Sequence, residues 1–260
     1  MKQILLFGLV LLLTFGCTQA NVQTHSKNTT SPSILRVGIS PNSPPIAYKE
    51  NGKIKGLEVD FAKGLAQFTG RTLKVIQVKW EDQIPSLISG KTDIIMSGMS
   101  ITDSRKYRIA FSNPYMLSGQ ISLIRLTDRN TFQSGATDLL NPSLKIGTIK
   151  GTTGDLFIQQ IRANGKRMQF DTSAKAVKKL LSRDLDAFIY DLPGNLYLAS
   201  QYESKGLTPV LIPLTKEYLA WGVRKNNPEL LSSVNQYLDS LKHEGTLLKT
   251  IQHWVPYYKP

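Results

Sequence analysis

The stretch Lys91-Thr-Asp-Ile-Ile-Met-Ser-Gly-Met-Ser-Ile-Thr-Asp-Ser-Arg105 joins an apolar strand pattern to a loop of small residues. Residues 93–97 predict a buried strand, and the loop after it carries Ser97, Gly98, Ser100 and finally Arg105. Arginine presents a planar fork of donors that matches the two oxygens of a carboxylate, and small residues let backbone and hydroxyl groups approach the same ligand. The stretch therefore predicts a carboxylate pocket, although a plain strand, turn and helix start would have the same spacing.

Strand and helix patterns alternate on both sides of this stretch. The expected strands cover residues 34–39, 73–78, 93–97, 120–126, 144–148, 168–170 and 187–190. The expected helices cover residues 58–68, 83–89, 154–163 and 173–181. Because the second half repeats the order of the first, we expect an α/β fold of two similar lobes, with the ligand between them at the carboxyl ends of the strands.

The N-terminus has the features of an export signal. Lys2 precedes an apolar run over residues 4–15, which is too short to span a bilayer and suits a secretory signal. Cys17, the only cysteine, follows this run where a bacterial lipoprotein would carry its lipid, although cleavage after Ala20 would release a soluble protein. We expect a signal peptide and lipobox over residues 1–20, a polar flexible tether over 21–33, and an exported protein held at the membrane through Cys17.

Composition excludes several classes of function. The net charge is +13, but Lys and Arg are scattered, so we expect no nucleic-acid partner. A single cysteine permits no disulfide within the chain. The three histidines, His25, His243 and His253, fall in the tether or near the C-terminus, so neither a zinc site nor a thiol-based catalytic centre can be assembled, and we expect no cofactor.

Five segments follow one another along the chain: Gly56-Leu-Glu-Val-Asp-Phe61, Lys91 to Met96, Arg183-Asp-Leu-Asp-Ala-Phe-Ile-Tyr-Asp191, Trp221-Gly-Val-Arg-Lys225 and Leu241-Lys-His-Glu-Gly245. In sequence and in order, they resemble segments of one known family, the bacterial extracellular solute-binding proteins of family 3, which deliver amino acids to ABC importers. The resemblance implies the two-lobed type II periplasmic-binding-protein fold. Lobe 1 would comprise residues 34–119 and 219–260 and lobe 2 residues 120–218, with hinge crossovers near 119–122 and 216–219.

The resemblance also implies roles for single residues. Arg105 would bind the α-carboxylate of an amino acid, and Asp191 would bind its α-ammonium group. Ser97, Gly98 and Ser100 would complete the site in lobe 1, with Trp80 packing on the ligand, and Lys150, Thr153 and Gly154 would complete it in lobe 2. Structural alternatives exist for three of these residues: a helix start for Arg105, a helix N-cap for Asp191 and an ordinary core position for Trp80.

Specificity depends on Ser40, Ser43 and Glu58. Family members that bind arginine or lysine commonly have an acid at the position of Ser40 and an aromatic residue at that of Ser43, and this chain has neither. Glu58 is a possible acidic partner for a ligand, or a helix-start residue favoured by the helix dipole. A buried guanidinium without a carboxylate is costly, so we expect a glutamine-like ligand, or an arginine-like one if Glu58 reaches it.

The resulting hypothesis is a monomeric, non-enzymatic receptor that closes on one free amino acid and delivers it to an ABC permease. Two alternatives share the fold: a periplasmic dehydratase and a ligand-sensing surface lipoprotein. A sensor would have the same pocket and a different partner.

Overall fold

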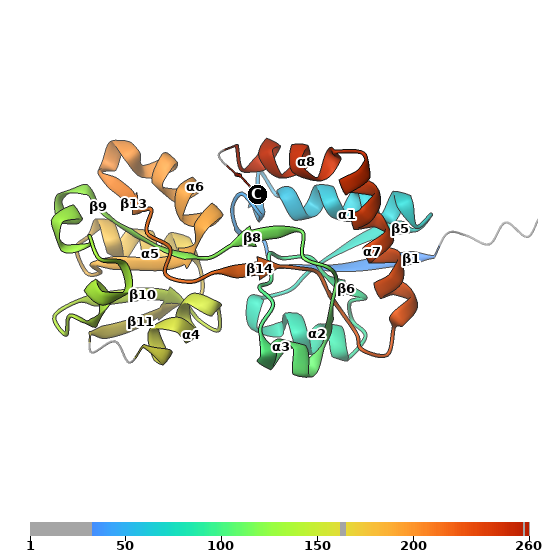
Figure 1. Cartoon of the computed structure of the whole chain (residues 1–260), viewed down its shortest axis with the longest axis horizontal. Helices are drawn as coiled ribbons and strands as arrows, with labels where there is room; N and C mark the ends of the chain where they lie inside the picture. Colours follow the sequence, from blue (N-terminus) through green and yellow to red (C-terminus); the bar gives the residue numbers. More distant parts are fainter. Residues whose placement is uncertain (1–32, 162–164, 257, 260) are drawn as a thin grey trace, which may run out of the picture. The chain divides into compact units, whose positions relative to one another are not determined.

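Two five-stranded sheets organise the computed structural model, which describes residues 33–161, 165–256 and 258–259 (Figure 1). These residues all belong to the unit Pro32–Pro260. The expected signal peptide, Cys17 and residues 21–32 of the expected tether lie outside the described residues.

The strands are β1 (Ile34–Ile39), β2 (Asn42–Ser43), β3 (Ala47–Glu50), β4 (Lys53–Lys55), β5 (Thr72–Gln77), β6 (Ile94–Ile95), β7 (Ala110–Phe111), β8 (Met116–Ser118), β9 (Gln120–Arg125), β10 (Lys145–Ile149), β11 (Lys166–Phe170), β12 (Ala187–Asp191), β13 (Leu207–Val210), β14 (Glu217–Leu219) and β15 (Gly222–Val223). The α-helices are α1 (Leu57–Phe68), α2 (Gln83–Ile88), α3 (Asp103–Arg108), α4 (Thr153–Gln160), α5 (Ser173–Leu181), α6 (Leu192–Tyr202), α7 (Pro228–His243) and α8 (Thr246–Trp254). The described residues also form short 3-10 helices: η1 (Trp80–Asp82), η2 (Leu126–Thr131), η3 (Gly135–Leu140) and η4 (Glu203–Lys205).

The first sheet has the order β5-β1-β6-β15-β7, and we call it, with its helices, lobe 1. Strands β5, β1 and β6 are parallel, and β15 pairs antiparallel with β6. Successive residues of β6 face opposite sides, so Ile94 packs in the core with α1, α7 and α8, while Ile95 packs in a second cluster with Leu87 of α2. Burial on both faces explains why the strand pattern is a continuous apolar run.

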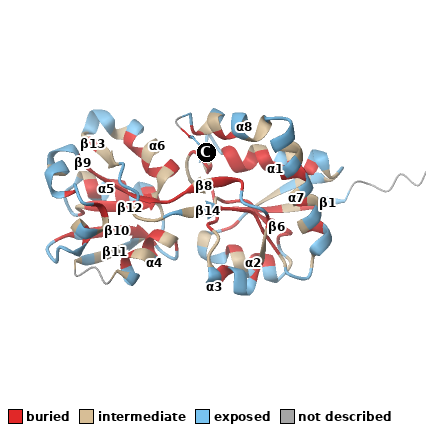
Figure 2. Ribbon diagram, in the orientation of Figure 1, coloured by how far each residue is buried: buried red, intermediate tan, exposed pale blue. Residues whose placement is uncertain are grey.

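The second sheet has the order β11-β10-β12-β9-β13 and forms lobe 2. Phe188 of β12 packs with the buried faces of α5 and α6, and its neighbour Ile189 packs with Ile158 of α4 on the opposite side. Helix α5 coincides with its predicted range because Ala176, Val177 and Leu180 form a buried stripe. In Figure 2 the central strands β10, β12 and β9 are buried along most of their length, whereas the edge strand β11 has no fully buried residue.

The two sheets are connected through an antiparallel pair, β8 and β14. The chain leaves lobe 1 through β8 and returns through β14, close to the crossovers expected near 119–122 and 216–219 (Figure 1). The exact lobe limits stay a prediction, since the described residues belong to one unit. Periodicity did not predict the small sheet β2-β3-β4, whose strands have two to four residues. Helix α4 ends at Gln160, short of its predicted range, and residues 162–164 lie outside the described part.

A buried carboxylate connects the core of lobe 1 to the predicted binding loop. Glu58, in the first turn of α1, is fully buried. Its Oε1 accepts hydrogen bonds from the backbone N–H of Gly98 at 2.6 Å and from the Tyr115 hydroxyl at 2.8 Å, and its Oε2 accepts one from the Trp221 indole at 2.8 Å. The hypothesis that Glu58 faces the ligand is therefore wrong, because its oxygens are directed at the core side of the loop.

Burial raises the pKa of Glu58 from its ordinary value of 4.5 to about 7, against the opposing effect of its three donors. We expect Glu58→Gln to lower the free energy of unfolding by about 1–3 kcal/mol, because an amide nitrogen would face a donor. The raised pKa stabilises the folded wild type most below pH 4.5. The difference in the free energy of unfolding between wild type and Glu58→Gln should therefore become smaller as the pH rises from about 4.5 to about 7. Urea unfolding at several pH values measures this, and a constant difference would contradict it.

Candidate functional site

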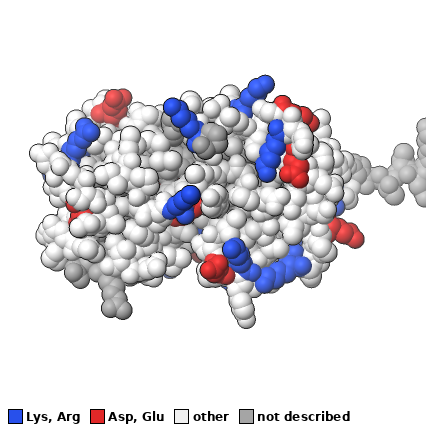
Figure 3. Space-filling model, viewed as in Figure 1, with Lys and Arg blue, Asp and Glu red and all other residues white. Residues whose placement is uncertain are grey.

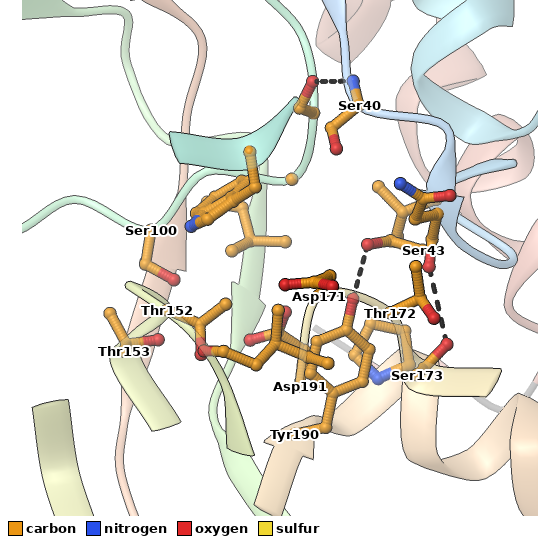
Figure 4. Close-up of a pocket in the computed structure, with 18 of the residues that line it drawn as sticks. Ser40, Ser43, Ser100, Thr152, Thr153, Asp171, Thr172, Ser173, Tyr190 and Asp191 are labelled. Atoms are coloured by element: carbon orange, nitrogen blue, oxygen red, sulfur yellow. Dashed lines mark hydrogen bonds between the residues drawn. The ribbon is translucent and has the colours of Figure 1, made fainter. Parts of the chain in front are cut away.

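A cavity lies where the parallel strands of both sheets end (Figure 4). About 600 Å³ of space free of protein atoms lies within it, its open mouth included. The lining residues follow or end β1, β6, β10, β11 and β12, or come from the loops and hinge between them: Ser40, Asn42, Ser43, Ile46, Trp80, Ser97, Gly98, Ser100, Arg105, Ile149, Thr152, Thr153, Asp171, Thr172, Ser173, Tyr190, Asp191, Pro193 and Leu219.

Arg105 supplies the cation of this cavity. It lies on the short helix α3, whose N-cap residue Thr102 accepts a hydrogen bond from the Arg105 backbone N–H at 3.3 Å. Its guanidinium is held on three sides: Nη1 donates to the Ser100 carbonyl at 2.8 Å, Nη2 donates to the Gly151 carbonyl at 3.4 Å, and the Trp80 ring centroid lies 5.3 Å from Cζ. With only 8% of its surface exposed, Arg105 is preorganised for an anion.

Asp191 ends β12 and occupies the N-cap position of α6, but its side chain makes no capping hydrogen bond. Instead its Oδ1 accepts a hydrogen bond from Nε2 of Gln120. Removal from bulk water and the nearby carboxylate of Glu217 raise the pKa of Asp191 to about 7, while Gln120 and Arg105 act in the opposite direction. Because the Asp191 side chain does not cap α6, it is available to a cationic ligand.

The loop before α4 brings lobe 2 to the same cavity. Gly151, at φ +73°, turns the chain so that its carbonyl accepts from the Trp80 indole at 3.1 Å and from Arg105. Buried Asp155 holds this loop, because its carboxylate accepts from the Gly151 N–H at 3.2 Å and from the Thr148 hydroxyl at 2.7 Å. One backbone carbonyl of lobe 2 thus bonds two donors of lobe 1.

Ser97 and Ser40 form the wall on the lobe 1 side. The Ser97 hydroxyl accepts from the Ser40 backbone N–H at 2.9 Å and lies 3.3 Å from the Gly38 carbonyl, to which it donates. Both serines are at most 5% exposed. Gly98, at φ +65°, has a conformation that favours glycine, and a Cβ there would lie 2.9 Å from the Ile46 side chain.

Neutral polar groups dominate the cavity end that lies away from Ser100 and Thr153. Ser43 of lobe 1 faces Thr172, Ser173 and Tyr190 of lobe 2 across this end (Figure 4). The Ser43 and Tyr190 hydroxyls hydrogen-bond to each other, and the Ser173 hydroxyl donates to the Asn42 carbonyl at 3.5 Å.

Asp171 is the one acid at this end, and it is already paired. Its carboxylate accepts a hydrogen bond from Lys175 at 2.7 Å, and both side chains are exposed. The hydrogen bond to Lys175, and more weakly the charges of Lys150 and Lys79, lower the pKa of Asp171.

The structure brings most of the predicted site residues together. Eight line the cavity: Ser40, Trp80, Ser97, Gly98, Ser100, Arg105, Thr153 and Asp191. Three do not: Glu58 is buried behind Gly98, Lys150 is exposed, and Gly154 packs against Gln120. Lys150 lies in the turn just after Ile149, the last residue of β10, and Gly154 lies in the first turn of α4.

Sequence reasoning missed Tyr190, Gln120 and Glu217. Tyr190 lies in an apolar strand, where a tyrosine is usual core. Gln120 and Glu217 lie within or next to the predicted hinge crossovers, where nothing in the residue pattern distinguishes them. Their position in the crossovers was the one signal available.

Charged side chains outside the cavity are spread over the surface that Figure 3 draws. On the face drawn in Figure 3, Lys and Arg lie dispersed, several of them next to Asp or Glu. No group of three or more His, Cys, Asp or Glu side chains is arranged for a metal ion among the residues with described positions. Within the same part of the chain, no helix has the length and apolar character needed to cross a membrane.

Known proteins with similar sequences and structures are amino-acid-binding proteins. The L-cystine-binding protein TcyJ of Escherichia coli (strain K12) is 27% identical over 221 residues, which cover 85% of this chain and 82% of that protein. A crystal structure of a putative ABC-transporter binding component from Wolinella succinogenes, complexed with lysine, has a TM-score of 0.82 and 32% identity and covers 86% of this chain and 96% of that one. The ancestral amino-acid-binding protein AncCDT-1, a precursor of cyclohexadienyl dehydratase, has a TM-score of 0.79 and 33% identity, covering 86% and 95% of the two chains.

The family comparison covers nearly all of the described residues. The model of the bacterial extracellular solute-binding proteins, family 3, matches residues 35–257, which include both sheets, the hinge strands and every residue that lines the cavity. This chain therefore belongs to the bacterial extracellular solute-binding proteins of family 3.

Proposed function

We propose that this protein is the substrate-binding component of an ABC importer, which captures one free polar amino acid between its lobes and delivers it to a permease. The observation that carries the proposal is the charge pattern of the cavity. Among the lining residues that the structure describes, Arg105 is the only cation, and Asp191 and Asp171 are the only acids. Arg105 suits an α-carboxylate and Asp191 an α-ammonium group, so the pair recognises the part that all amino acids share.

Closure around the ligand follows from where these groups lie. Arg105 belongs to lobe 1 and Asp191 to lobe 2, so a ligand that contacts both favours the form in which the lobes are together. The contacts of Trp80 and Arg105 with the Gly151 carbonyl support the same form. A permease that recognises the closed form would then recognise occupancy.

The accepted side chain is neutral and polar, such as that of glutamine. With Glu58 behind the loop, Asp171 is the remaining acid that could meet a cationic side chain, and Lys175 already neutralises it. The hydroxyls of Ser43, Thr172 and Tyr190 carry no charge and can hydrogen-bond to the side-chain amide of such a ligand.

Calorimetric titration with glutamine and with arginine, after a thermal-shift screen of all the amino acids, tests this proposal. We expect glutamine to bind more tightly, and at a hundred times its dissociation constant it should add about 2.7 kcal/mol to stability. Arg105→Ala should cost about 2–5 kcal/mol of binding, because it removes a buried cation that faces the carboxylate. No binding of any amino acid would refute the function. Tight arginine binding that Asp171→Asn abolishes would instead make Asp171 the specificity residue.

Binding should also depend on pH, because Asp191 must be ionised to hold an ammonium group. The charged or titratable groups near Asp191 are Arg105, Glu217, Tyr190 and Tyr115. Since the pKa of Asp191 in the empty protein is about 7, affinity should fall as the pH drops below that value, by up to about tenfold per pH unit. Asp191→Asn should bind weakly at every pH and lose this dependence. Titrations across the acidic range would contradict the proposal if wild type showed no such fall.

The protein acts outside the cytoplasm, held at the membrane by lipid on Cys17. Export is supported by the apolar run over residues 4–15 and by the family, whose members are extracellular. The polar residues 21–33 supply a tether between the lipid and the lobes.

Cys17→Ser should move the protein from the membrane fraction to the soluble fraction, because it removes the thiol that carries the lipid. Globomycin should cause a larger precursor of the wild type to accumulate. Fractionation followed by immunoblotting measures both effects. An identical distribution of wild type and variant would favour cleavage after Ala20.

A further inference from the structure

The hinge strand β14 carries a carboxylate that reaches both lobes. Glu217 Oε2 accepts hydrogen bonds from the Ser100 hydroxyl of lobe 1 and, at 2.7 Å, from the Thr153 hydroxyl of lobe 2. Its Oε1 accepts one from the Thr215 hydroxyl at 2.6 Å. Ser100 and Thr153 line the amino-acid cavity, whereas Glu217 lies behind them.

The backbone holds Glu217 in this position. Glu217 pairs with Ser118 of β8 across the hinge, and Leu219, two residues further on the same side of the strand, lines the cavity. Ser100 forms an isolated bridge with Leu219, and the Ile101 N–H donates to the Tyr218 carbonyl at 2.9 Å. The Ser100 hydroxyl and the carboxylate are thus fixed beside each other by main-chain bonds.

The direction of these hydrogen bonds determines whether the cavity presents donors or acceptors to a ligand. A hydroxyl group has one proton, and the protons of Ser100 and Thr153 are both donated to Glu217. Thr153 also accepts from Gln120 Nε2 at 3.0 Å, and the same amide donates to Asp191. Toward a ligand, Ser100 and Thr153 present lone pairs, which suit an ammonium group and not a carboxylate.

We propose that Glu217 is a positioning residue for the ligand's α-ammonium group: it orients the Ser100 and Thr153 hydroxyls as acceptors and adds a second negative charge beside Asp191. This inference rests on the proposed function. The electrostatic effect of Glu217 on Asp191 is in keeping with it, since Glu217 raises the pKa of Asp191. The carboxylate of the ligand is left to Arg105 and to backbone N–H groups.

The test compares glutamine with its deamino analogue, glutaramic acid, by calorimetry with competition where binding is weak. Glu217→Gln should weaken glutamine binding about tenfold or more and the analogue much less, because only glutamine carries the ammonium group. Asp155→Asn is the matched control, since Asp155 is a buried carboxylate that holds the same lobe 2 loop from the other side. It should change the affinities of both ligands by the same factor. If the screen selects another amino acid, that compound and its deamino analogue replace the pair.

The dependence of affinity on pH gives a second measurement. It should not change in Glu217→Gln if Glu217 has only a structural role. Removing the Glu217 charge should lower the pKa of Asp191, so the acidic fall in affinity should move to lower pH in Glu217→Gln. Equal losses for both ligands, or an unmoved profile, would overturn the inference while leaving the proposed function intact. If Glu217→Gln does not fold, Thr153→Val removes one oriented hydroxyl, and an equal loss for both ligands there would overturn it as well. Failure of wild type to bind any amino acid would refute both proposals.

Discussion

The lobe 1 half of the site depends on the hydrogen bonds that the buried carboxylate of Glu58 accepts. It joins the first turn of α1 to Gly98, Tyr115 and Trp221, residues that lie up to 163 positions away from it in the sequence. A buried carboxylate with three donors is costly to disturb, because the loss of one partner leaves a polar group unsatisfied away from water. The loop that carries Ser97, Gly98 and Ser100 therefore has a fixed support, and Arg105 is positioned relative to that support.

Among the described residues, lobe 2 meets lobe 1 at polar contacts and at a ring contact between Tyr48 and Tyr197. The Gly151 carbonyl accepts from Trp80 and Arg105, and the Ser43 and Tyr190 hydroxyls bond at the other end of the cavity. These contacts are few and neutral or singly charged, in contrast to the apolar clusters inside each lobe. Such an interface can open without exposing a hydrophobic core, which is what a receptor that admits and releases a ligand requires.

Three charged side chains lie in or behind the cavity in addition to Asp171. Arg105 lies at one side, Asp191 at another, and Glu217 lies behind Ser100 and Thr153, between the lobes and on the hinge itself. The position of Glu217 links the ligand contacts to the strand about which the lobes would move. A change in closure would therefore change the hydrogen bonds that the ligand encounters. If Glu217 orients these hydroxyls as we propose, ligand binding and hinge geometry are coupled through this one side chain.

Periodicity and residue type predicted the α/β class, an export signal, the strands β1, β5, β6, β9, β10, β11 and β12 and the helices α1, α2, α4 and α5, because they report burial and charge over short distances. The binding roles of Arg105 and Asp191 came from the resemblance to the family and stay a prediction. The small sheet β2-β3-β4 and the end of α4 were not predicted, because tertiary hydrogen bonds set such short strands and helix ends. Only the tertiary structure decided that Glu58 faces the core and that Glu217, 117 residues from Ser100, faces the cavity walls. In the sequence, Glu58 stands at the start of an expected helix and Glu217 stands in an expected hinge crossover. Which way such a side chain points depends on the donors that distant segments bring to it, and no local pattern contains that information.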